Sequence, residues 1–330
     1  MPAILTNNLS VINAENFVDS FVNGDSNIYM GVGRGYEEGD SIGTSSKDDY
    51  NKWTDKNDSS INESNPPVPV DSIAKQKEFR DGLLGIKRVQ INDITIMVPR
   101  VDWIAGKRYN VLNESDKLGI RATDYYCINE NNEVWLCVNA PTDKTVTATI
   151  MPSFNSLKLE SGSTNENIEN NVRSFIFKEN TSTNCYWWKY LYTIPTSIAN
   201  KKLLDGWMPV LFSKHGIYQQ GGGTLGENQY MYGDVNANRT LGAYRVMLTC
   251  TLGDEDTVIP YDSIYRQVGL IVDPTEIKQS VDTPAARLTG DLFNEDEFDK
   301  YSGELVYLEN KKPVHREHNQ TETLRLFLVF

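Results

Sequence analysis

The residues best suited to chemistry on a phosphate lie in the glycine-rich run Gly31-Val32-Gly33-Arg34-Gly35. Such a run binds anions when its backbone N–H groups open a helix and point at the ligand. No helical pattern follows it here, and Glu37, Glu38 and Asp40 would repel a phosphate. We therefore interpret the run as a turn at the end of a strand, with a nucleotide-binding turn as the alternative.

Acidic and sulfur side chains supply two candidate metal sites. The acidic run 294–299 could bind calcium, but it lacks the alternating Asp/Asn positions and the central glycine of an EF-hand loop. Cys127 and Cys137 are too far apart in sequence for a zinc half-site, and the close histidine pair His315 and His318 lies in a polar turn. We expect a solvated acidic face and buried cysteines, with no metal or other cofactor; a calcium-stabilised fold is kept as a third possibility.

Nucleophilic catalysis would need a histidine held beside a serine or cysteine. The sequence has three histidines, and no serine lies in a Gly-x-Ser-x-Gly elbow. Paired carboxylates for glycoside cleavage are uninformative, because 45 acidic residues offer many possible pairs. We expect the protein not to be an enzyme.

The aromatic run Tyr186–Tyr192 is the most informative cluster. Trp187, Trp188 and Tyr190 place large rings on both faces of one predicted strand, so both faces should be covered. A glycan-binding platform would also use exposed tryptophans. The apolar alternation and the following Ile194-Pro195 favour a core or a subunit interface instead.

Charge narrows the class of partner. The 330 residues contain 45 acidic and 32 basic side chains, which gives a formal net charge of −13 and a pI near 4.8. This charge disfavours nucleic acid and anionic membranes as partners.

No apolar stretch approaches the roughly 20 residues of a spanning helix, and the first ten residues lack a signal-peptide pattern. We expect synthesis in a cytoplasm, which agrees with four scattered cysteines.

Helical patterns that could position these residues occur at two places. Residues 1–27 contain a short amphipathic helix, expected to start after Asn13, that forms an N-terminal arm. A second helix is expected to begin at Asp71 or Ser72 and to run to Leu84, just before Gly85.

Strand patterns dominate the rest of the chain. The predicted strands are Ile28–Gly33, Ile86–Arg100 broken at Asn92-Asp93, the hairpin Tyr125–Val138, Thr145–Met151, Arg173–Phe177, Tyr186–Ile194, Ala243–Thr251, Ile264–Val272, Leu305–Leu308 and Leu324–Phe330. Their spacing leaves no room for a crossover helix after each strand, so we expect antiparallel sheets. The predicted fold is mainly β: a layered antiparallel β-sandwich with a few helical insertions. Residues 28–330 would form one body, with long loops at about 35–65, 160–171 and 219–239.

A series of short blocks occurs in an order found in one known family. The blocks are Ile28–Arg34, Pro66–Ser72, Val98–Trp103, Val134–Pro141, Trp188–Pro195, Tyr265–Pro274 and the C-terminal Ser302–Pro313, Asn319–Glu322 and Leu326–Phe330. Together they resemble the gene-eight baseplate wedge family of T-even-type contractile-tailed bacteriophages, most closely at the C-terminus. The chain departs from the family after Arg34, where the family tends to place Pro-Trp.

The resemblance implies a layered β-sandwich, a homodimer, and a place among the other wedge subunits, without catalysis. Our leading hypothesis is a structural subunit of the virion tail baseplate, made in the host cytoplasm. It would bind neighbouring wedge proteins and relay baseplate rearrangement on host attachment, without inserting into a membrane or binding nucleic acid. The alternative is a virion-associated tail protein that binds or cleaves glycans.

Several side chains are candidates for interface or fold-defining roles. Arg100 and Asp102 can pair while Trp103 anchors their loop. The loose alternation between Glu304 and Glu309 suggests that both faces of that strand are covered. The full set is Arg34, Arg100, Asp102, Trp103, Trp187, Trp188, Tyr190, Glu304, Tyr307, Glu309 and Asn310.

Overall fold

The structure is a computed structural model of residues 1–330. It describes residues 7–22, 27–35, 53, 58–111, 124–153, 176–180, 184–202, 204–210, 237–252, 264–276, 292–294, 298–317 and 321–330. The chain divides into two compact units. Unit 1 contains Met1–Val22, Thr95–Met247 and Phe327–Phe330, and unit 2 contains Asn23–Ile94 and Leu248–Leu326. The predicted arm at residues 1–27 and single body at 28–330 stay predictions.

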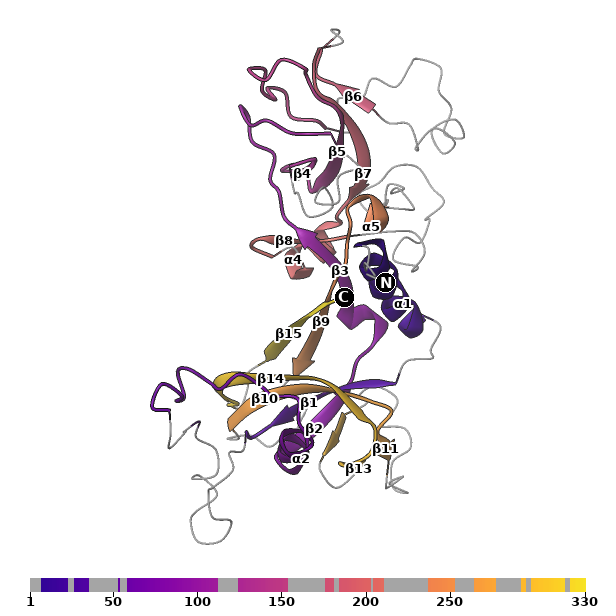
Figure 1. Ribbon diagram of the computed structural model, residues 1–330. Helices are drawn as coiled ribbons and strands as arrows, with labels where there is room; N and C mark the ends of the chain where they lie inside the picture. The colour runs from indigo at the N-terminus through magenta and orange to yellow at the C-terminus, as the bar shows by residue number, and fades with distance from the viewer. Residues whose placement is uncertain are drawn as a thin grey trace, which may run out of the picture. The chain divides into compact units, whose positions relative to one another are not determined.

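The elements are mostly strands (Figure 1). The helices are α1 (Asn7–Val22), α2 (Ile73–Asp81), α4 (Thr196–Lys202), α5 (Ala237–Thr240) and the 3-10 helix η1 (Ile91–Asp93). The strands are β1 (Ile28–Gly33), β2 (Leu83–Arg88), β3 (Ile94–Pro99), β4 (Tyr126–Ile128), β5 (Glu133–Asn139), β6 (Ile176–Lys178), β7 (Trp187–Thr193), β8 (Trp207–Pro209), β9 (Arg245–Leu252), β10 (Ile264–Val272), β11 (Thr275–Glu276), β12 (Leu292–Asn294), β13 (Phe298–Asp299), β14 (Glu304–His315) and β15 (Glu322–Val329).

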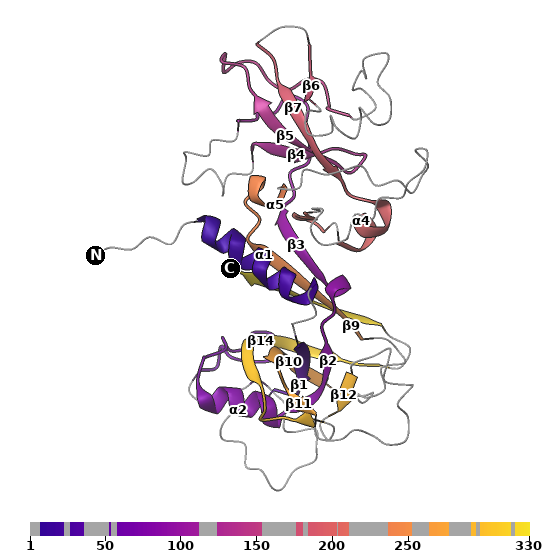
Figure 2. The ribbon, with the colours of Figure 1, turned by 90° about the vertical axis from the view of Figure 1, so that its right-hand side faces the viewer.

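Unit 2 is built on a five-stranded sheet of order β12-β2-β1-β10-β14, in which the paired strands are antiparallel. Helix α2 lies against this sheet in both ribbon views (Figures 1 and 2). Ser72 caps the helix by accepting a hydrogen bond from the backbone N–H of Lys75. Phe79 projects from α2 into a buried cluster with Tyr29, Leu83, Ile86 and Ile271.

Glycines make room for the Phe79 ring. Gly31 on β1 pairs with Gly269 on β10, and a methyl group added at Gly269 would lie 2.6 Å from two ring atoms of Phe79. A methyl group added at Gly33 would lie less close, at 3.2 Å from the ring. Gly31 and Gly33 therefore lie inside the strand predicted over Ile28–Gly33 and admit a ring where a side chain would clash, and the expected turn follows the strand at Gly35, whose φ is +80°.

Unit 1 contains an antiparallel four-stranded sheet of order β4-β5-β7-β6. Tyr190, Leu191 and Tyr192 on β7 are all at least 98% buried. Because successive strand residues point to opposite faces, both faces of β7 are covered, as its sequence predicted. Trp135 and Trp188 complete this aromatic core.

A third sheet has the order β15-β9-β3-β8, in which Val98 on β3 pairs with Met208 on β8.

Helix α1 buries one stripe of side chains, which comprises Val11, Ala14, Val18 and Phe21. The ring of Phe17 lies 5.2 Å from that of Phe330. No helix among the described residues is long and apolar enough to cross a membrane.

The mainly β, antiparallel fold is confirmed, and several boundaries are corrected. Helix α1 starts at Asn7 rather than after Asn13, and α2 ends at Asp81 because Gly82 caps it and Leu83 already belongs to β2. No strand forms over 145–151, where Thr145 instead closes a turn on Asp143. The loop expected at 160–171 lies outside the described residues.

Two further predictions concern loops and strand faces. Of the loop predicted at 35–65, the structure describes Gly35, Trp53 and a run of turns from Asp58. Of the loop predicted at 219–239, it describes the start of α5.

The expectation that both faces of the strand at 305–308 are covered is wrong. β14 is an edge strand with no buried residue, and Val306 is 58% exposed.

Candidate interaction surface

The candidate residues fall into separate places, beginning with the segment after β3. The predicted pairing of Arg100 with Asp102 is confirmed: an Arg100 guanidinium nitrogen lies 2.8 Å from Asp102 Oδ1. The backbone N–H of Trp103 donates to the carbonyl of Ile128, 2.9 Å away, which ties the segment to the end of β4. The ion pair is partly exposed, so it orients the segment and adds little stability.

The β7 aromatics contribute to the core. Trp188 is fully buried and Tyr190 is 2% exposed, with its hydroxyl bonded to Thr193. Trp187 is partly buried, and Lys178 Nζ lies 4.1 Å from the centroid of its ring. Trp188 and Tyr190 therefore present no open aromatic platform to a glycan.

Arg34 lies apart from the other candidates. Its backbone N–H donates to the carbonyl of Gly82, which joins the end of β1 to the end of α2. Its side chain is partly buried.

The remaining candidates lie along β14. The Tyr307 hydroxyl donates to Glu309 Oε2 over 2.9 Å, and burial together with this hydrogen bond raises the pKa of Tyr307. Glu304 is exposed at the start of the strand. Asn310 is partly buried and reaches two other elements: its amide nitrogen donates to Pro67 and its amide oxygen accepts from Gln267 Nε2, each over 2.9 Å.

A groove of about 560 Å³ lies beside Asn310. We call it the β14 groove and define it by the residues that line it: Trp53, Asp58, Ser60, Ile61, Asn65, Pro66, Pro67, Val68, Pro69, Val70, Lys75, Gln267, Leu308 and Asn310. One wall is the extended segment Pro66–Val70, and the opposite wall comes from β10 and β14. The proline segment holds its shape without sheet pairing because its φ angles are preset.

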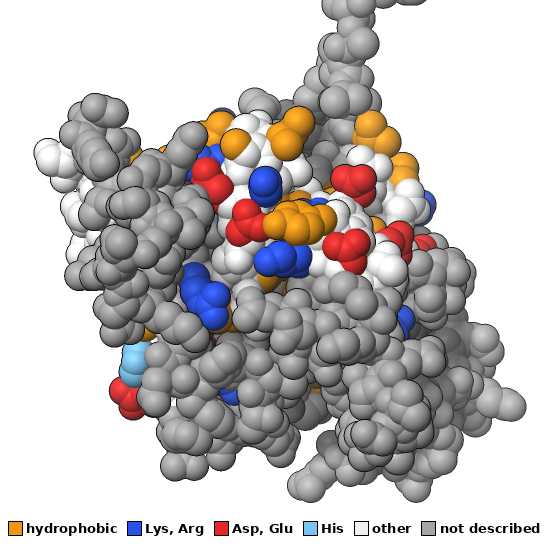
Figure 3. Space-filling model, turned by 90° about the horizontal axis from the view of Figure 1, so that it is seen from below, with side chains coloured by type: hydrophobic (Ala, Val, Ile, Leu, Met, Phe, Trp, Pro, Cys, Tyr) orange, Lys and Arg blue, Asp and Glu red, His pale blue; other side chains and the backbone are white. Residues whose placement is uncertain are grey.

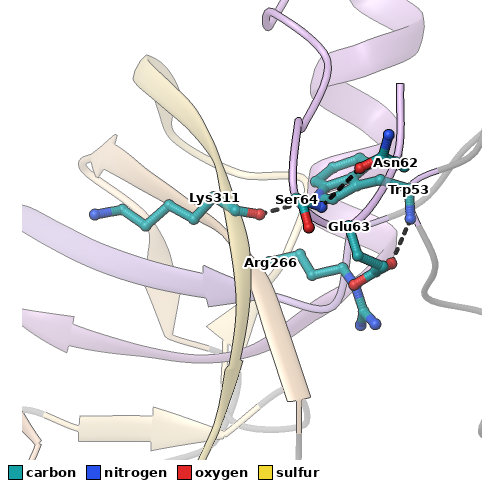
Figure 4. Close-up of polar contacts among 6 residues, drawn as sticks. All are labelled: Trp53, Asn62, Glu63, Ser64, Arg266 and Lys311. Carbon is teal, nitrogen blue, oxygen red and sulfur yellow. Dashed lines mark hydrogen bonds and ion pairs between the residues drawn. The ribbon is translucent and has the colours of Figure 1, made fainter. Parts of the chain in front are cut away.

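Trp53, Glu63 and Arg266 fix the segment before the prolines to β10 and β14 (Figure 4). Trp53 is 3% exposed, and its indole N–H donates to the carbonyl of Lys311 on β14 over 2.8 Å. Glu63 accepts the backbone N–H of Trp53 over 2.6 Å and the Nε–H of Arg266 at 3.0 and 3.1 Å. The wall of the groove is thus held by a buried ring and a largely buried ion pair.

Sequence reasoning missed these three anchors. Trp53 could have been found, because a large aromatic ring inside a polar loop is costly to expose and suggests docking. Glu63 and Arg266 are 203 positions apart, and nothing in the local sequence pattern indicates that they meet.

In the described part of the chain, no three His, Cys, Asp or Glu side chains are grouped so that they could hold a metal ion. The acidic run 294–299 lies partly outside that part, as do His215 and His318. All four cysteines are free and buried, as expected.

Comparison with known proteins gives two matches. The family described as Bacteriophage T4, Gp8 matches residues 10–330. The baseplate wedge protein gp8 of Enterobacteria phage T4 is 22% identical over 297 residues, which span 80% of this chain and 83% of that relative.

Proposed function

The chain belongs to the family of the bacteriophage T4 protein gp8, and on that premise we propose that it is a structural subunit of a phage tail baseplate wedge. In this role it is a component of the virion. It works by binding neighbouring wedge proteins and relaying their rearrangement on host attachment, and it catalyses no reaction. The observation that carries the proposal is the family match along nearly the whole chain.

The described surface supports a binding role. The edge strand β14 leaves Val306 58% exposed, and the neighbouring proline segment leaves Val68 84% and Val70 61% exposed. Figure 3, which views the molecule from below, shows exposed hydrophobic side chains interspersed with acidic and basic ones. An exposed sheet edge and apolar side chains in a charged surround are features of protein–protein contact sites.

Reconstitution tests the proposal. The purified full-length protein is mixed with the other wedge proteins of its phage, and the mixture is separated by size-exclusion chromatography. Co-elution with at least one of them is expected. Independent elution from every wedge protein, or normal virion assembly after deletion of the gene, would contradict the proposal.

We also propose that the protein is a homodimer. Sedimentation equilibrium of the purified protein should give a mass near twice 37.4 kDa at micromolar concentration. A mass of one chain across that concentration range would refute the dimer while leaving the wedge role open.

A further inference from the structure

We propose that the β14 groove binds an extended segment of a neighbouring protein, and that this segment inserts a lysine or arginine side chain. The inference rests on the proposed function, because it names the chemistry of one partner of a wedge subunit. It is carried by three features of the groove: an unused hydrogen-bond acceptor, its residual charge and its exposed apolar wall.

The first feature is an unused acceptor. Gln267 is 5% exposed, and its amide nitrogen donates a hydrogen bond to Asn310. Its amide oxygen is buried and has no hydrogen-bond partner among the described residues. A buried acceptor left without a donor costs about 1–3 kcal/mol, so an N–H group that reaches this oxygen from the groove gains more than at a solvated surface.

The proline segment of the groove, like Gln267, presents hydrogen-bond acceptors. Pro66, Pro67 and Pro69 have no backbone N–H, so at these positions the wall can offer carbonyl oxygens but no backbone donors. The carbonyl of Pro67 is already bonded to Asn310, so an occupant that meets the wall at Pro66 and Pro69 needs donors there. Peptide N–H groups and the side chains of lysine and arginine meet this need, whereas a carboxylate side chain does not.

The second feature is the charge of the groove. Asp58 accepts hydrogen bonds from the hydroxyl and the backbone N–H of Ser60, and these hold the pKa of its carboxyl below the ordinary value. Asp58 is therefore ionised at neutral pH. Lys75, the basic residue among the described lining, lies 2.9 Å from Glu78 Oε2, so its charge is already balanced. The charge left in the groove is negative, as is the net charge of −13 on the chain.

The third feature is the apolar surface beside that charge. Val68 and Val70 are both lining residues and both largely exposed, and Leu308 faces the groove from β14. Lysine and arginine suit such a surface, because their methylene stems lie along apolar groups while the charged head stays near an acid. An extended segment suits this wall, because the wall is formed by residues of two paired strands, Gln267 on β10 with Leu308 and Asn310 on β14.

Peptides tiled along the other wedge proteins of the same phage provide the probe. Twelve-residue peptides are screened against the full-length protein, and affinities are measured by fluorescence polarisation for those that bind. We expect the binders to contain lysine or arginine, and replacement of that residue by glutamate should abolish binding.

Variants then locate the site. Val68 is so exposed that either charge should be tolerated, so V68K and V68E form a matched pair. V68K should bind the basic peptides about 3- to 10-fold more weakly than V68E. Asp58→Asn should weaken binding about 2- to 5-fold. Its control is Asp143→Asn, because Asp143 in unit 1 makes the same pair of bonds to Thr145 and lies outside the groove.

Every outcome decides the proposal. Basic binders that discriminate V68K from V68E and ignore Asp143→Asn support it. Acidic binders, equal binding to V68K and V68E, or no binder at all would overturn it. If these results are negative while the wild-type protein still co-elutes with wedge proteins, the groove chemistry is refuted and the wedge role stands.

Discussion

Arg266 carries a buried charge in unit 2. Its side chain is 5% exposed, and one guanidinium nitrogen, Nη1, has no hydrogen-bond partner among the described residues. Glu63 supplies the compensating charge and also holds the backbone of Trp53. A buried guanidinium that loses its partner becomes an uncompensated charge, which is far costlier than a broken surface pair.

Glu63→Ala should therefore destabilise the protein by about 2–3 kcal/mol, less than for a fully buried pair because the Glu63 side chain is 32% exposed. Urea unfolding followed by circular dichroism measures the loss. The control is Glu130→Ala, an exposed acid in the turn between β4 and β5, which should change stability by less than about 0.5 kcal/mol. Equal losses for the two variants would show that the pair contributes no specific stability.

Thiol reactivity should report on the core of unit 1. Burial raises the pKa of Cys137 from its ordinary value of 9.0 to about 12. At pH 8 the native protein should react with iodoacetamide far more slowly than the urea-unfolded chain, because the thiolate is the reacting species. Mass spectrometry of alkylated peptides follows the reaction.

The raised pKa of Cys137 also makes the stability of the protein depend on pH. The folded state keeps the Cys137 proton to higher pH than the unfolded chain, so this thiol favours folding below about pH 9 and loses that contribution as pH rises toward 12. Cys137→Ala should flatten this part of the pH profile. Rapid native labelling of Cys137 at pH 8 would contradict the described burial.

Among the elements, α2 depends on glycines in the strands beneath it. A methyl group at Gly269 would lie 2.6 Å from two atoms of the Phe79 ring and 3.0 Å from Leu305. Gly269→Ala should therefore cost about 1–3 kcal/mol or more, because an overpacked core displaces rings or backbone. Adding Phe79→Leu should recover part of the loss, so the double variant loses less than the sum of the two single changes, as measured by urea unfolding. Additive losses would show that the ring and the glycine do not conflict.

The sequence predicted elements well where one pattern determined them. β10 has the predicted bounds Ile264–Val272, and the aromatic run was correctly expected to have two covered faces, since alternation is a local signal. Three-dimensional context decided the rest. The twelve-residue β14 contains Lys311, Lys312 and Pro313, which dilute the strand pattern but suit an exposed edge. The β14 groove was not predictable, because its walls come from segments about 200 positions apart.

At the scale of the whole molecule, each unit is assembled from segments that are distant in the chain. Unit 1 takes residues 1–22 from the N-terminal end and 327–330 from the other, and the second segment follows all of unit 2 in sequence. Unit 1 can therefore be completed only after unit 2 has been synthesised. A small number of residues, those at 327–330, can therefore have a large effect on the folding of unit 1.

Deletion of residues 327–330 tests this dependence. The Phe330 ring lies 5.2 Å from Phe17, its backbone N–H donates to Tyr244, and the Phe327 ring lies 5.5 Å from Trp207. Removing these contacts should destabilise unit 1 by about 2–4 kcal/mol, because two half-buried aromatic anchors are lost together. Pulse proteolysis in urea, with cleavage sites mapped by mass spectrometry, should show earlier cleavage within 95–247. The double variant F327A/F330A keeps the backbone bond to Tyr244 and should lose less. If the deletion leaves cleavage of 95–247 unchanged, the four residues are dispensable, and unit 1 does not depend on a segment that follows unit 2.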